Sequence, residues 1–570
     1  MPPRERAVPV MLARDHAIES LALERFDVVV IGGGITGAGV ALDAATRGYS
    51  VALVEKTDFA AGTSSRSSKL VHGGLRYLQN FDLGLVREAL LERQLLVKLA
   101  PHLVRPLKLV VPAFDGDRPD LLVGIGLNMY DVMATPRLRG RRSARRAAAE
   151  AGADPDGDWS PERHRMISGD EVVELLPALA GRNPTGGYLF YDCQTDDVRL
   201  VLTVLGEAER FGAICANRLE VIELVREEGR ESGVRVRDVE TDSDFIVRAD
   251  NVVNATGVWA DRIRPEELHS EADVPTIRPS RGTHITVAHE DLPLVAGAIV
   301  PAAGGRTIFA LPWLGRSLIG TTDNDYDGEI DHVKPSAEDV EYLLEATNSF
   351  FGTSLRASDL TGSYAGVRPL ISTGDSKKSV DISRKAELYE TSSGMITITG
   401  GKLTTWRRMA KLAVDRLVER DGRAAPCRTN EIPLGLSVDP ASLPEVEGVP
   451  EESYGALAAR YGHAAHEVLR TVSERGTQLA QPIVAGLPDL LAEVPFAARY
   501  EQARSVGDVL LRRTRLGILA AGELHAEDGA ALARVAQALG NELGWDERRI
   551  NLELERFRVE GELEGILAEA

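Results

Sequence analysis

The sequence predicts an α/β protein: a nucleotide-binding βαβ unit comes first, a β-rich region follows, and a helical region ends the chain. Three observations support this fold class. A glycine-rich turn joins two apolar β-type runs within residues 26–56. Residues 284–400 alternate with the period of strands, and residues 451–570 show an almost entirely helical pattern. A chain of 570 residues should form two or three domains around a large core.

The first βαβ unit carries the pattern G-x-G-x-x-G. The apolar run 28–31 leads into Gly32, Gly34 and Gly37, and a helix-like segment follows. Gly32 suits the tight turn, Gly34 lets the backbone approach a pyrophosphate, and Gly37 lets helix and strand pack closely. The pyrophosphate is then expected at the helix N-terminus, where free N–H groups and the helix dipole favour an anion.

Glu55 ends the second β-type run, 50–54. Its carboxylate can accept hydrogen bonds from both ribose hydroxyls of an adenosine and would repel a 2′-phosphate. The adenosine half therefore belongs to FAD or NAD rather than NADP. A glycine-rich turn without a ligand is the alternative.

Composition excludes several classes of function. A net charge of −20 argues against a nucleic-acid binder. Cys193, Cys215 and Cys427 are widely spaced, so we expect reduced thiols in a cytoplasmic protein and neither a disulfide framework nor a metal site. The first residues lack the apolar core of a signal peptide, and the apolar stretch 28–42 is too short and glycine-rich to span a membrane.

Further along the chain, periodicity predicts the main elements. We expect helices over 81–100, 121–135, 197–211 and 336–351, and strands over 108–112, 221–225, 234–239 and 244–247. Another strand should enter a tight turn at Ala255, Thr256 and Gly257, so that the sheet returns to the nucleotide. Six arginines lie within residues 136–146.

Two sets of polar residues carry candidate chemistry. Hydroxyls and a cation in residues 63–69 can wrap a diphosphate, and His72 before two glycines allows the backbone to approach a planar ring closely. Basic residues at turns in the β-rich region, including Arg368 and Lys402, suit a phosphate or carboxylate of a small substrate. A P-loop is disfavoured, because the position six residues before Lys402, where its first glycine would fall, is not glycine. A solvated serine-rich turn and surface ion pairs are the alternatives.

Several motifs occur in one order: GGGITGAG, TSSRSSKLVHGGLRYLQ, NATGVWAD, RGTHI, YAGVRPL, TGGKLTTWR and SVGDVLLRRTRLG. Together they closely resemble the FAD-dependent glycerol-3-phosphate dehydrogenases of the respiratory, quinone-linked type. The resemblance runs from about Phe26 to the end of the sequence. Trp406 departs from it, standing where a tyrosine is usual after GGKLTT, which should change packing more than chemistry.

The resemblance implies a Rossmann-type FAD-binding domain interleaved with an antiparallel-sheet substrate domain, plus an α-helical C-terminal cap domain. We place an N-terminal extension at 1–25, the oxidoreductase region at 26–425 and the cap at 426–570. The substrate domain should occupy mainly 100–185 and 270–395. The family oxidises sn-glycerol 3-phosphate to dihydroxyacetone phosphate and passes the electrons to a membrane quinone.

The resemblance also implies site residues. Arg76 and Tyr77 should lie beside the substrate, and Arg368 and Lys402 should hold its phosphate. The residues expected at FAD are Gly32, Gly34, Gly37, Glu55, Lys56, Thr63, Ser64, Ser65, Ser68, Lys69, Leu70, His72, Gly73, Gly74, Ala255, Thr256, Gly257, Gly401, Lys402, Leu403 and Thr404.

Oxidation of a secondary alcohol by a flavin needs a neutral base for the hydroxyl proton. Arg and Lys are poor bases at neutral pH, so His284 and His72 remain as candidates. We favour His284 because it is placed with the substrate-domain turn, and we expect His284, His72 and Arg368 to form the catalytic set.

Three other functions stay open. An oxidase on the same fold would pass electrons to O₂ and release peroxide, a non-catalytic FAD-binding redox sensor would keep only the fold, and an amino-acid-oxidase-type enzyme would need to bind a carboxylate and an amine. The apolar helix 121–135 and the arginines behind it could rest on an anionic bilayer near the quinone, which favours the dehydrogenase. We therefore expect a cytoplasmic protein attached peripherally to the inner face of the cell membrane, with a homodimer as an option.

Overall fold

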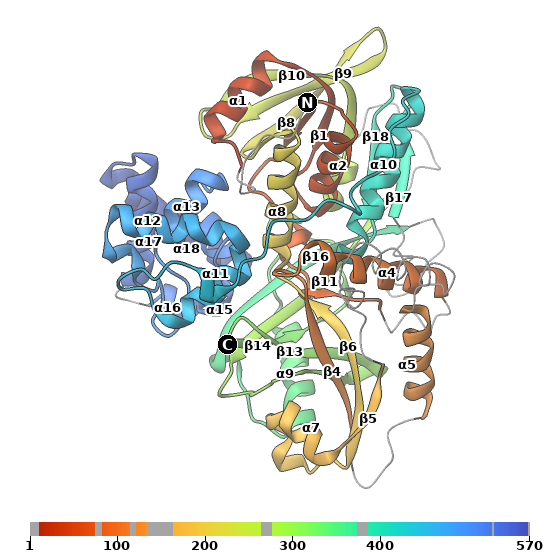
Figure 1. Cartoon of the computed structure of the whole chain (residues 1–570), viewed down its shortest axis with the longest axis vertical. Helices are drawn as coiled ribbons and strands as arrows, with labels where there is room; N and C mark the ends of the chain where they lie inside the picture. Colours follow the sequence, from red (N-terminus) through yellow and green to blue (C-terminus); the bar gives the residue numbers. More distant parts are fainter. Residues whose placement is uncertain are drawn as a thin grey trace.

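The computed structural model describes residues 11–74, 82–114, 121–134, 163–263, 276–372, 386–526 and 529–567. Two sheets and a helical region make up the fold, which confirms the predicted class (Figure 1). The first sheet, which contains the glycine-rich βαβ unit, lies above the second, mainly antiparallel sheet in Figure 1. The C-terminal helices lie to the side of both sheets.

The first sheet contains the glycine-rich βαβ unit. Its order is β17-β18-β10-β1-β2-β7, and β8 and β9 extend it beside β10. The parallel pairs are β1 with β2 and β10, β2 with β7, and β10 with β18. Its strands are β1 (Arg25–Ile31), β2 (Val51–Val54), β7 (Ile214–Ala216), β8 (Leu219–Glu227), β9 (Arg230–Asp238), β10 (Ser243–Asn254), β17 (Ala386–Glu390) and β18 (Ile396–Gly400).

Alternating residues of β1 face the two sides of this sheet, as the period of a strand requires. Val28 and Val30 pack into the core formed with α2 (Ile35–Thr46), α8 (Asp197–Arg210) and α10 (Trp406–Arg420). Val29 and Ile31 belong to the core on the opposite face. Because both faces are covered, the strand reads as a continuous apolar run.

Helix α1 (Arg14–Leu23) covers part of that opposite face with its buried side chains Ala17 and Leu21. Arg14 also pairs with Asp238 at 2.6 Å. The expected N-terminal extension is therefore part of the domain from residue 11 onward. No sequence pattern indicated this helix, because it has little apolar periodicity of its own.

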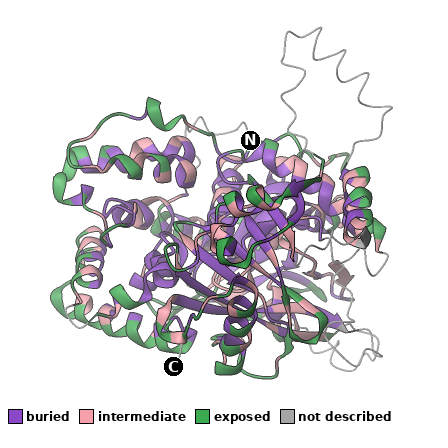
Figure 2. Cartoon of the chain, turned by 90° about the horizontal axis from the view of Figure 1, so that it is seen from below, coloured by how far each residue is buried: buried purple, intermediate pink, exposed green. Residues whose placement is uncertain are grey.

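The second sheet is mainly antiparallel and runs β15-β11-β14-β13-β12-β4-β6-β3, with β16 beside β11 and β5 beside β6. Its strands are β3 (Leu70–Val71), β4 (Arg105–Ala113), β5 (Arg165–Ser168), β6 (Gly186–Gln194), β11 (Thr276–Ala288), β12 (Gly297–Ala302), β13 (Arg306–Trp313), β14 (Arg316–Gly320), β15 (Asn324–Asp325) and β16 (Leu360–Ser372). Buried residues lie mainly at the centre of the molecule (Figure 2).

Strands β6 and β17 do not follow the segments expected for the substrate domain. Strand β6 pairs with β4 along its whole length, so the second sheet continues past residue 185. Strand β17 pairs with β18 in the first sheet, although it lies inside the expected segment 270–395. Alternation along a strand shows that it is a strand, but the choice of sheet depends on long-range pairing.

Capping residues fix where the remaining helices begin. Asp196 accepts the N–H groups of Val198 and Arg199 before α8, and Ser336 accepts that of Asp339 before α9 (Ala337–Phe351). The other helices of the two-sheet part are α4 (Leu83–Leu99), α5 (Leu121–Ala134) and α7 (Gly169–Leu175).

The C-terminal region is helical, as predicted. Its helices are α11 (Glu451–Tyr461), α12 (Ala465–Arg475), α13 (Glu493–Tyr500), α14 (Val506–Arg512), α15 (Leu516–Leu519), α16 (Ala521–Leu524), α17 (Ala530–Leu543) and α18 (Glu547–Glu564). None of the helices in the described part of the chain is long and apolar enough to cross a membrane.

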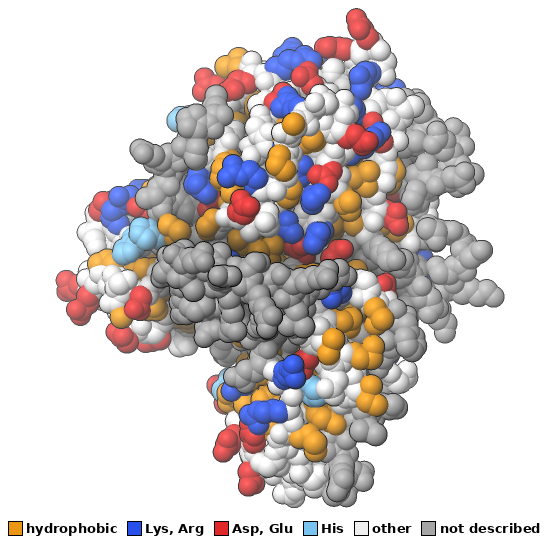
Figure 3. All heavy atoms as spheres, turned by 45° about the vertical axis from the view of Figure 1, so that its right-hand side comes forward, with side chains coloured by type: hydrophobic (Ala, Val, Ile, Leu, Met, Phe, Trp, Pro, Cys, Tyr) orange, Lys and Arg blue, Asp and Glu red, His pale blue; other side chains and the backbone are white. Residues whose placement is uncertain are grey.

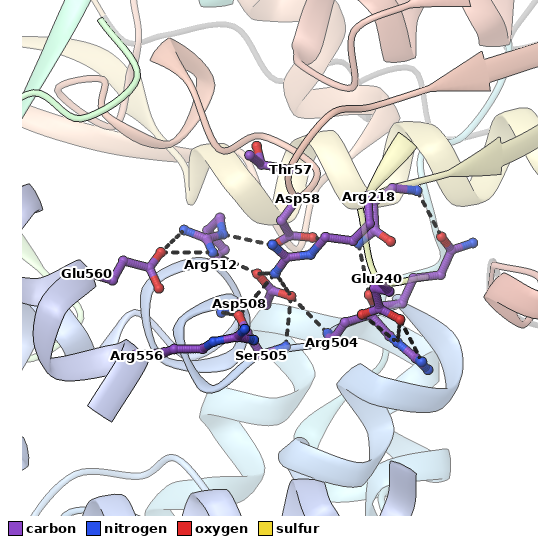
Figure 4. A network of polar contacts seen from close by, with 12 residues as sticks. Thr57, Asp58, Arg218, Glu240, Arg504, Ser505, Asp508, Arg512, Arg556 and Glu560 are labelled. Atoms are coloured by element: carbon purple, nitrogen blue, oxygen red, sulfur yellow. Dashed lines mark hydrogen bonds and ion pairs between the residues drawn. The ribbon is translucent and has the colours of Figure 1, made fainter. Parts of the chain in front are cut away.

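Buried ion pairs dock these helices against the first sheet (Figure 4). Asp58, just after β2, accepts from Arg512 Nε at 2.8 Å and from Arg513 Nη2 at 2.9 Å. Arg512 and Arg218 both donate to Asp508 Oδ1 at 2.7 Å. The motif SVGDVLLRRTRLG thus contributes several of the ion pairs that hold the helical region in place.

Candidate functional site

A cavity of about 610 Å³ lies at the carboxyl ends of the parallel strands β1, β2, β10 and β18. Ligands of α/β sheets bind at this edge. Its lining includes Gly32, Gly34, Glu55, Lys56, Thr63, Ser64, Ala255, Thr256, Gly257, Gly401, Lys402 and Leu403, all of which the sequence predicted at the cofactor.

The glycine-rich turn has no space for side chains. Gly32 has a φ of +108°, and a Cβ there would lie 2.8 Å from the carbonyl oxygen of Ala255. A Cβ on Gly37 would lie 1.9 Å from the carbonyl oxygen of Gly32. The turn therefore needs glycine at both positions, and it directs the N-terminus of α2 toward the cavity wall at Gly34.

Glu55 is oriented by the backbone around it. Oε2 accepts the N–H of Gly33 at 2.7 Å, and Oε1 accepts the N–H of Thr57 at 2.9 Å. Burial raises the pKa of Glu55, whereas these hydrogen bonds favour the carboxylate. Oε1 also accepts the Thr57 hydroxyl at 3.2 Å, whereas Oε2 keeps a second lone pair for a ribose hydroxyl.

A smaller cavity of about 200 Å³ adjoins the first. Thr63, Ser64, Lys402 and Leu403 line both cavities. Other predicted residues line the small cavity only: Ser68, Leu70, His72, His284, Arg368 and Thr404. The structure thus brings the expected cofactor residues and the expected substrate residues to one continuous region.

Arg368, on β16, is held in place by neighbouring side chains and backbone. Nη2 donates to Thr321 Oγ1 and to the carbonyl oxygen of Thr322, both at 3.1 Å, and Nη1 lies 3.3 Å from Asp323 Oδ1. Lys402 follows β18 through Gly400 and Gly401, which both have a positive φ. Two cations from different strands therefore meet at the small cavity.

His284 lies opposite Tyr364 in the β11–β16 pair, and the two rings stack with centroids 4.7 Å apart. Its Nε2 is 2.8 Å from Ser68 Oγ. Burial, with the charges of Lys69 and Arg368, holds the pKa of His284 well below its ordinary value. The imidazole is therefore neutral at physiological pH.

His72 follows β3 and lines the same cavity. Its backbone N–H donates to Thr404 Oγ1 at 3.1 Å, and its ring meets Phe309 edge-on. Both histidine candidates thus face the small cavity.

Five residues expected at the cofactor, Gly37, Ser65, Lys69, Gly73 and Gly74, do not line either cavity. Lys69 is the clearest departure, because its fully buried ammonium lies 2.8 Å from Asp197. Burial, with the nearby charge of Arg515, lowers the pKa of Lys69 to about 7. The cation expected at a diphosphate instead belongs to a buried ion pair beneath the loop.

Ser65 and Gly73 are also engaged elsewhere. Ser65 Oγ donates to the carbonyl oxygen of Gly62 at 3.1 Å, and the N–H of Gly73 donates to the Tyr130 hydroxyl at 2.8 Å. Arg76 and Tyr77 lie outside the described residues. Lys56 lies at the rim, where it pairs with Glu220 at 3.3 Å.

Sequence reasoning missed several lining residues: Arg66, Trp259, His332 and Gly282. Arg66 and Trp259 lie inside motifs that were quoted, so their place in the chain was a usable signal. His332 follows an irregular segment with no motif. In the described part of the chain, no group of three or more His, Cys, Asp and Glu is arranged to hold a metal ion.

Residues 27–416 match the family model described as FAD dependent oxidoreductase, and residues 395–550 match that of the C-terminal domain of alpha-glycerophosphate oxidase. Glycerol-3-phosphate dehydrogenase 2 of Mycobacterium tuberculosis is 37% identical, and the alignment covers 98% of this chain and 91% of the relative. The aerobic glycerol-3-phosphate dehydrogenase of Bacillus subtilis is 35% identical over 88% of this chain and 89% of the relative.

The chain belongs to the FAD-dependent glycerol-3-phosphate dehydrogenases. The solved structure of the glycerol-3-phosphate dehydrogenase from Bacillus halodurans, complexed with FAD, is similar over 98% of both chains, with a TM-score of 0.75 and 29% identity. An L-alpha-glycerophosphate oxidase from Mycoplasma pneumoniae shares the fold, with a TM-score of 0.53 and 18% identity over 73% of this chain.

FAD is the cofactor of this family, and the residues of the large cavity fit it. The three glycines of residues 32–34 and the start of α2 suit the diphosphate, and Glu55 suits the ribose. Trp406 is fully buried, and a Cβ on Gly39 of α2 would lie 2.6 Å from its ring. Trp406 therefore packs closely against α2.

Proposed function

We propose that this protein oxidises sn-glycerol 3-phosphate to dihydroxyacetone phosphate with FAD and passes the electrons to a membrane quinone. The observation that carries the proposal is the small cavity, in which Arg368 and Lys402 lie beside a neutral His284 next to the cofactor cavity. The relatives' names supply the substrate.

The cations bind the phosphate of the substrate. Arg368 presents a planar fork whose direction is set by Thr321, Thr322 and Asp323, and Lys402 supplies a point charge from the opposite domain. Because the two residues come from different sheets, the phosphate is held between them and the rest of the substrate extends toward the cofactor cavity.

His284 takes the proton of the substrate hydroxyl. The low pKa of His284 keeps the ring unprotonated, although it also makes the ring a weaker base. Ser68 and Tyr364 fix the orientation of the ring. Bound FAD would supply the acceptor for the hydride equivalent of the substrate carbon. His72 lines the same cavity and is the second candidate for the base.

Helix α5 supports the membrane part of the proposal. Ile125, Met129 and Val132 are 49%, 38% and 72% exposed, whereas Leu127 and Tyr130 on the other side of the helix are buried. Hydrophobic side chains gather on the face of the molecule that carries this helix (Figure 3). We propose that the enzyme rests with this face on the cytoplasmic side of the membrane, where a quinone can approach. The arginines of 136–146 lie outside the described residues.

Anaerobic flavin reduction tests the proposal. Purified protein is mixed with sn-glycerol 3-phosphate, glycerol, inorganic phosphate and a panel of amino acids, and loss of flavin absorbance is followed. We expect bleaching by sn-glycerol 3-phosphate alone. Bleaching by an amino acid instead would indicate an amino-acid oxidase, and a flavin that no compound reduces would indicate a redox sensor.

Reoxidation then identifies the acceptor. The reduced enzyme is mixed with a soluble quinone or with O₂, and peroxide is measured. We expect fast reoxidation by the quinone and slow reoxidation by O₂. Fast reoxidation by O₂ with one peroxide per flavin would establish the oxidase, a function that the family name of the C-terminal region also carries.

A further inference from the structure

Arg66 is a cation of the small cavity that the proposed mechanism has not used. It follows the turn η1 (Thr63–Ser65), and its side chain is only 12% exposed. The side chain lies over Gly366 of β16, where a Cβ would come within 2.5 Å of Arg66 Cβ. Arg66, Arg368 and Lys402 therefore line one cavity from three segments of the chain.

The guanidinium of Arg66 is held by a residue from the helical region. Nη2 lies 2.6 Å from Oε2 of Glu564, in the last turn of α18, and Nη1 donates to the carbonyl oxygen of Ala365 at 3.3 Å. These contacts use two of the five N–H groups of an arginine, so three remain to meet an anion.

Glu564 has a second partner at the rim of the cofactor cavity. His332 Nδ1 lies 2.9 Å from Glu564 Oε1, and His332 itself lines the large cavity. Burial opposes ionisation of Glu564, but the charge of Arg66 and the hydrogen bond from His332 outweigh it, so the pKa of Glu564 is lowered. The carboxylate is therefore ionised at neutral pH.

The end of α18 is fixed to the strand that carries Arg368. Ser363 on β16 donates its hydroxyl to the carbonyl oxygen of Gly565 at 2.6 Å, and its N–H to that of Ile566 at 2.9 Å. Gly565 closes the helix with a φ of +62°. Glu564 is thus held at a defined position relative to Arg66 and Arg368.

We propose that Arg66 is a third cation for the phosphate of the substrate, and that Glu564 is a positioning residue that aims it. The inference rests on the proposed function, because it assigns the phosphate-bearing substrate to the small cavity. An arginine side chain is long and flexible, and a fixed carboxylate keeps its fork at the cavity wall. The helical region would then contribute to substrate affinity as well as to the fold.

Kinetics of Arg66→Ala, Glu564→Gln and the double variant test this role. We expect each single variant to raise KM for sn-glycerol 3-phosphate about tenfold, the effect of one charge-assisted hydrogen bond. The kcat should stay within about twofold, and the FAD content should not change. The double variant should match Arg66→Ala alone, because Glu564 acts through Arg66.

Glu562→Gln is the matched control, since Glu562 lies on the same turn of α18 but is exposed. Its KM should equal that of the wild type. Arg66→Lys keeps the charge but loses the fork, and should give an intermediate KM. If Glu564→Gln folds poorly, Arg66→Lys and Arg66→Ala still decide whether Arg66 meets the phosphate.

Two results would overturn the inference. One is a wild-type KM in Arg66→Ala. The other is a Glu564→Gln variant that melts at a lower temperature with KM unchanged, which would make Glu564 purely structural. Failure of the proposed function is a separate result, because the wild-type flavin itself would then not be reduced by sn-glycerol 3-phosphate.

Discussion

At Glu55, the backbone N–H groups of Gly33 and Thr57 orient both carboxylate oxygens before any ligand binds. Glu55→Gln replaces one of these acceptors with an NH₂ group that faces an N–H donor. We expect the variant to lose about 1.5–3 kcal/mol of FAD binding, because the ribose loses a charge-assisted acceptor. The ratio of flavin to protein absorbance after dialysis measures this.

Glu220→Gln is the control, because Glu220 lines the same cavity but pairs with Lys56 at its rim. That variant should retain FAD. Full FAD occupancy in Glu55→Gln would show that this carboxylate does not bind the ribose.

At the small cavity, Arg368→Ala and Lys402→Ala should each raise KM for sn-glycerol 3-phosphate steeply. Losing one charged contact to the phosphate costs roughly 2–5 kcal/mol. Arg368→Lys should not fully restore KM, because an ammonium cannot reproduce the fork held by Thr321 and Thr322. Steady-state kinetics with a quinone acceptor measure these values.

Arg262→Ala serves as the control, since Arg262 lines the large cavity and pairs with Asp331. If its KM rises as much as those of Arg368→Ala and Lys402→Ala, the rise in KM comes from the loss of positive charge near the cavities and not from a lost contact with the phosphate. An unchanged KM in both of those variants would place the phosphate elsewhere.

Sequence reasoning was most reliable where the chemistry depends on the backbone. Gly32 and Gly37 were predicted from spacing, and their positions leave no space for a side chain. Lys69 shows the limit, because a cation in a polar loop gives no sign of which way it points. It lies buried against Asp197, and the neighbouring Arg66 faces the cavity instead.

Among the elements, helix α5 exposes a face that a folded domain would normally bury. The triple variant Ile125→Ser, Met129→Ser and Val132→Ser should pellet less with anionic vesicles than the wild type. Each apolar side chain removed from the interface costs about 1.5–3 kcal/mol of burial when it is fully inserted. Sedimentation with vesicles at low salt measures the bound fraction.

A triple variant of exposed residues on α18, Leu552→Ser, Val559→Ser and Leu563→Ser, is the matched control. It should bind vesicles as the wild type does. Equal pelleting of the α5 variant and the wild type would show that this helix is not the anchor.

Helices were predicted from the sequence almost to the residue where a polar cap marks the start. The helix expected over 336–351 begins after the cap Ser336, and the one expected over 197–211 begins after Asp196. Sheet membership was harder to predict. Strand β6 joins the second sheet through β4, a partner that is distant in the sequence. Local patterns do not contain that pairing.

On the scale of the whole molecule, His102 lies where the two-sheet part meets the segment that leads into the helical region. Its ring packs near Gly435 and Gly462. Burial, with the charges of Arg105 and Arg199, lowers the pKa of His102 to about 4. The folded protein therefore holds this ring neutral, whereas the unfolded chain takes up a proton below about pH 6.5.

Stability should consequently fall as the pH drops from about 6.5 to about 4. Between these pH values the free energy of unfolding of the wild type should fall by up to about 3 kcal/mol more than that of a His102→Gln variant. The stability advantage of the wild type over the variant at pH 7.5 should shrink by this amount at pH 4. Urea unfolding of both holoproteins across this range measures it, and a constant difference would contradict it.

The docking of the helical region at Asp58 has a thermodynamic consequence. Asp58 lies three residues after Glu55, so one short segment carries the carboxylate proposed for the ribose at one end and contacts Arg512 and Arg513 at the other. If FAD binding orders this segment, it strengthens the docking of the helical region. Docking then strengthens FAD binding by the same free energy. Cofactor release and detachment of the helices should therefore be linked as one cooperative event.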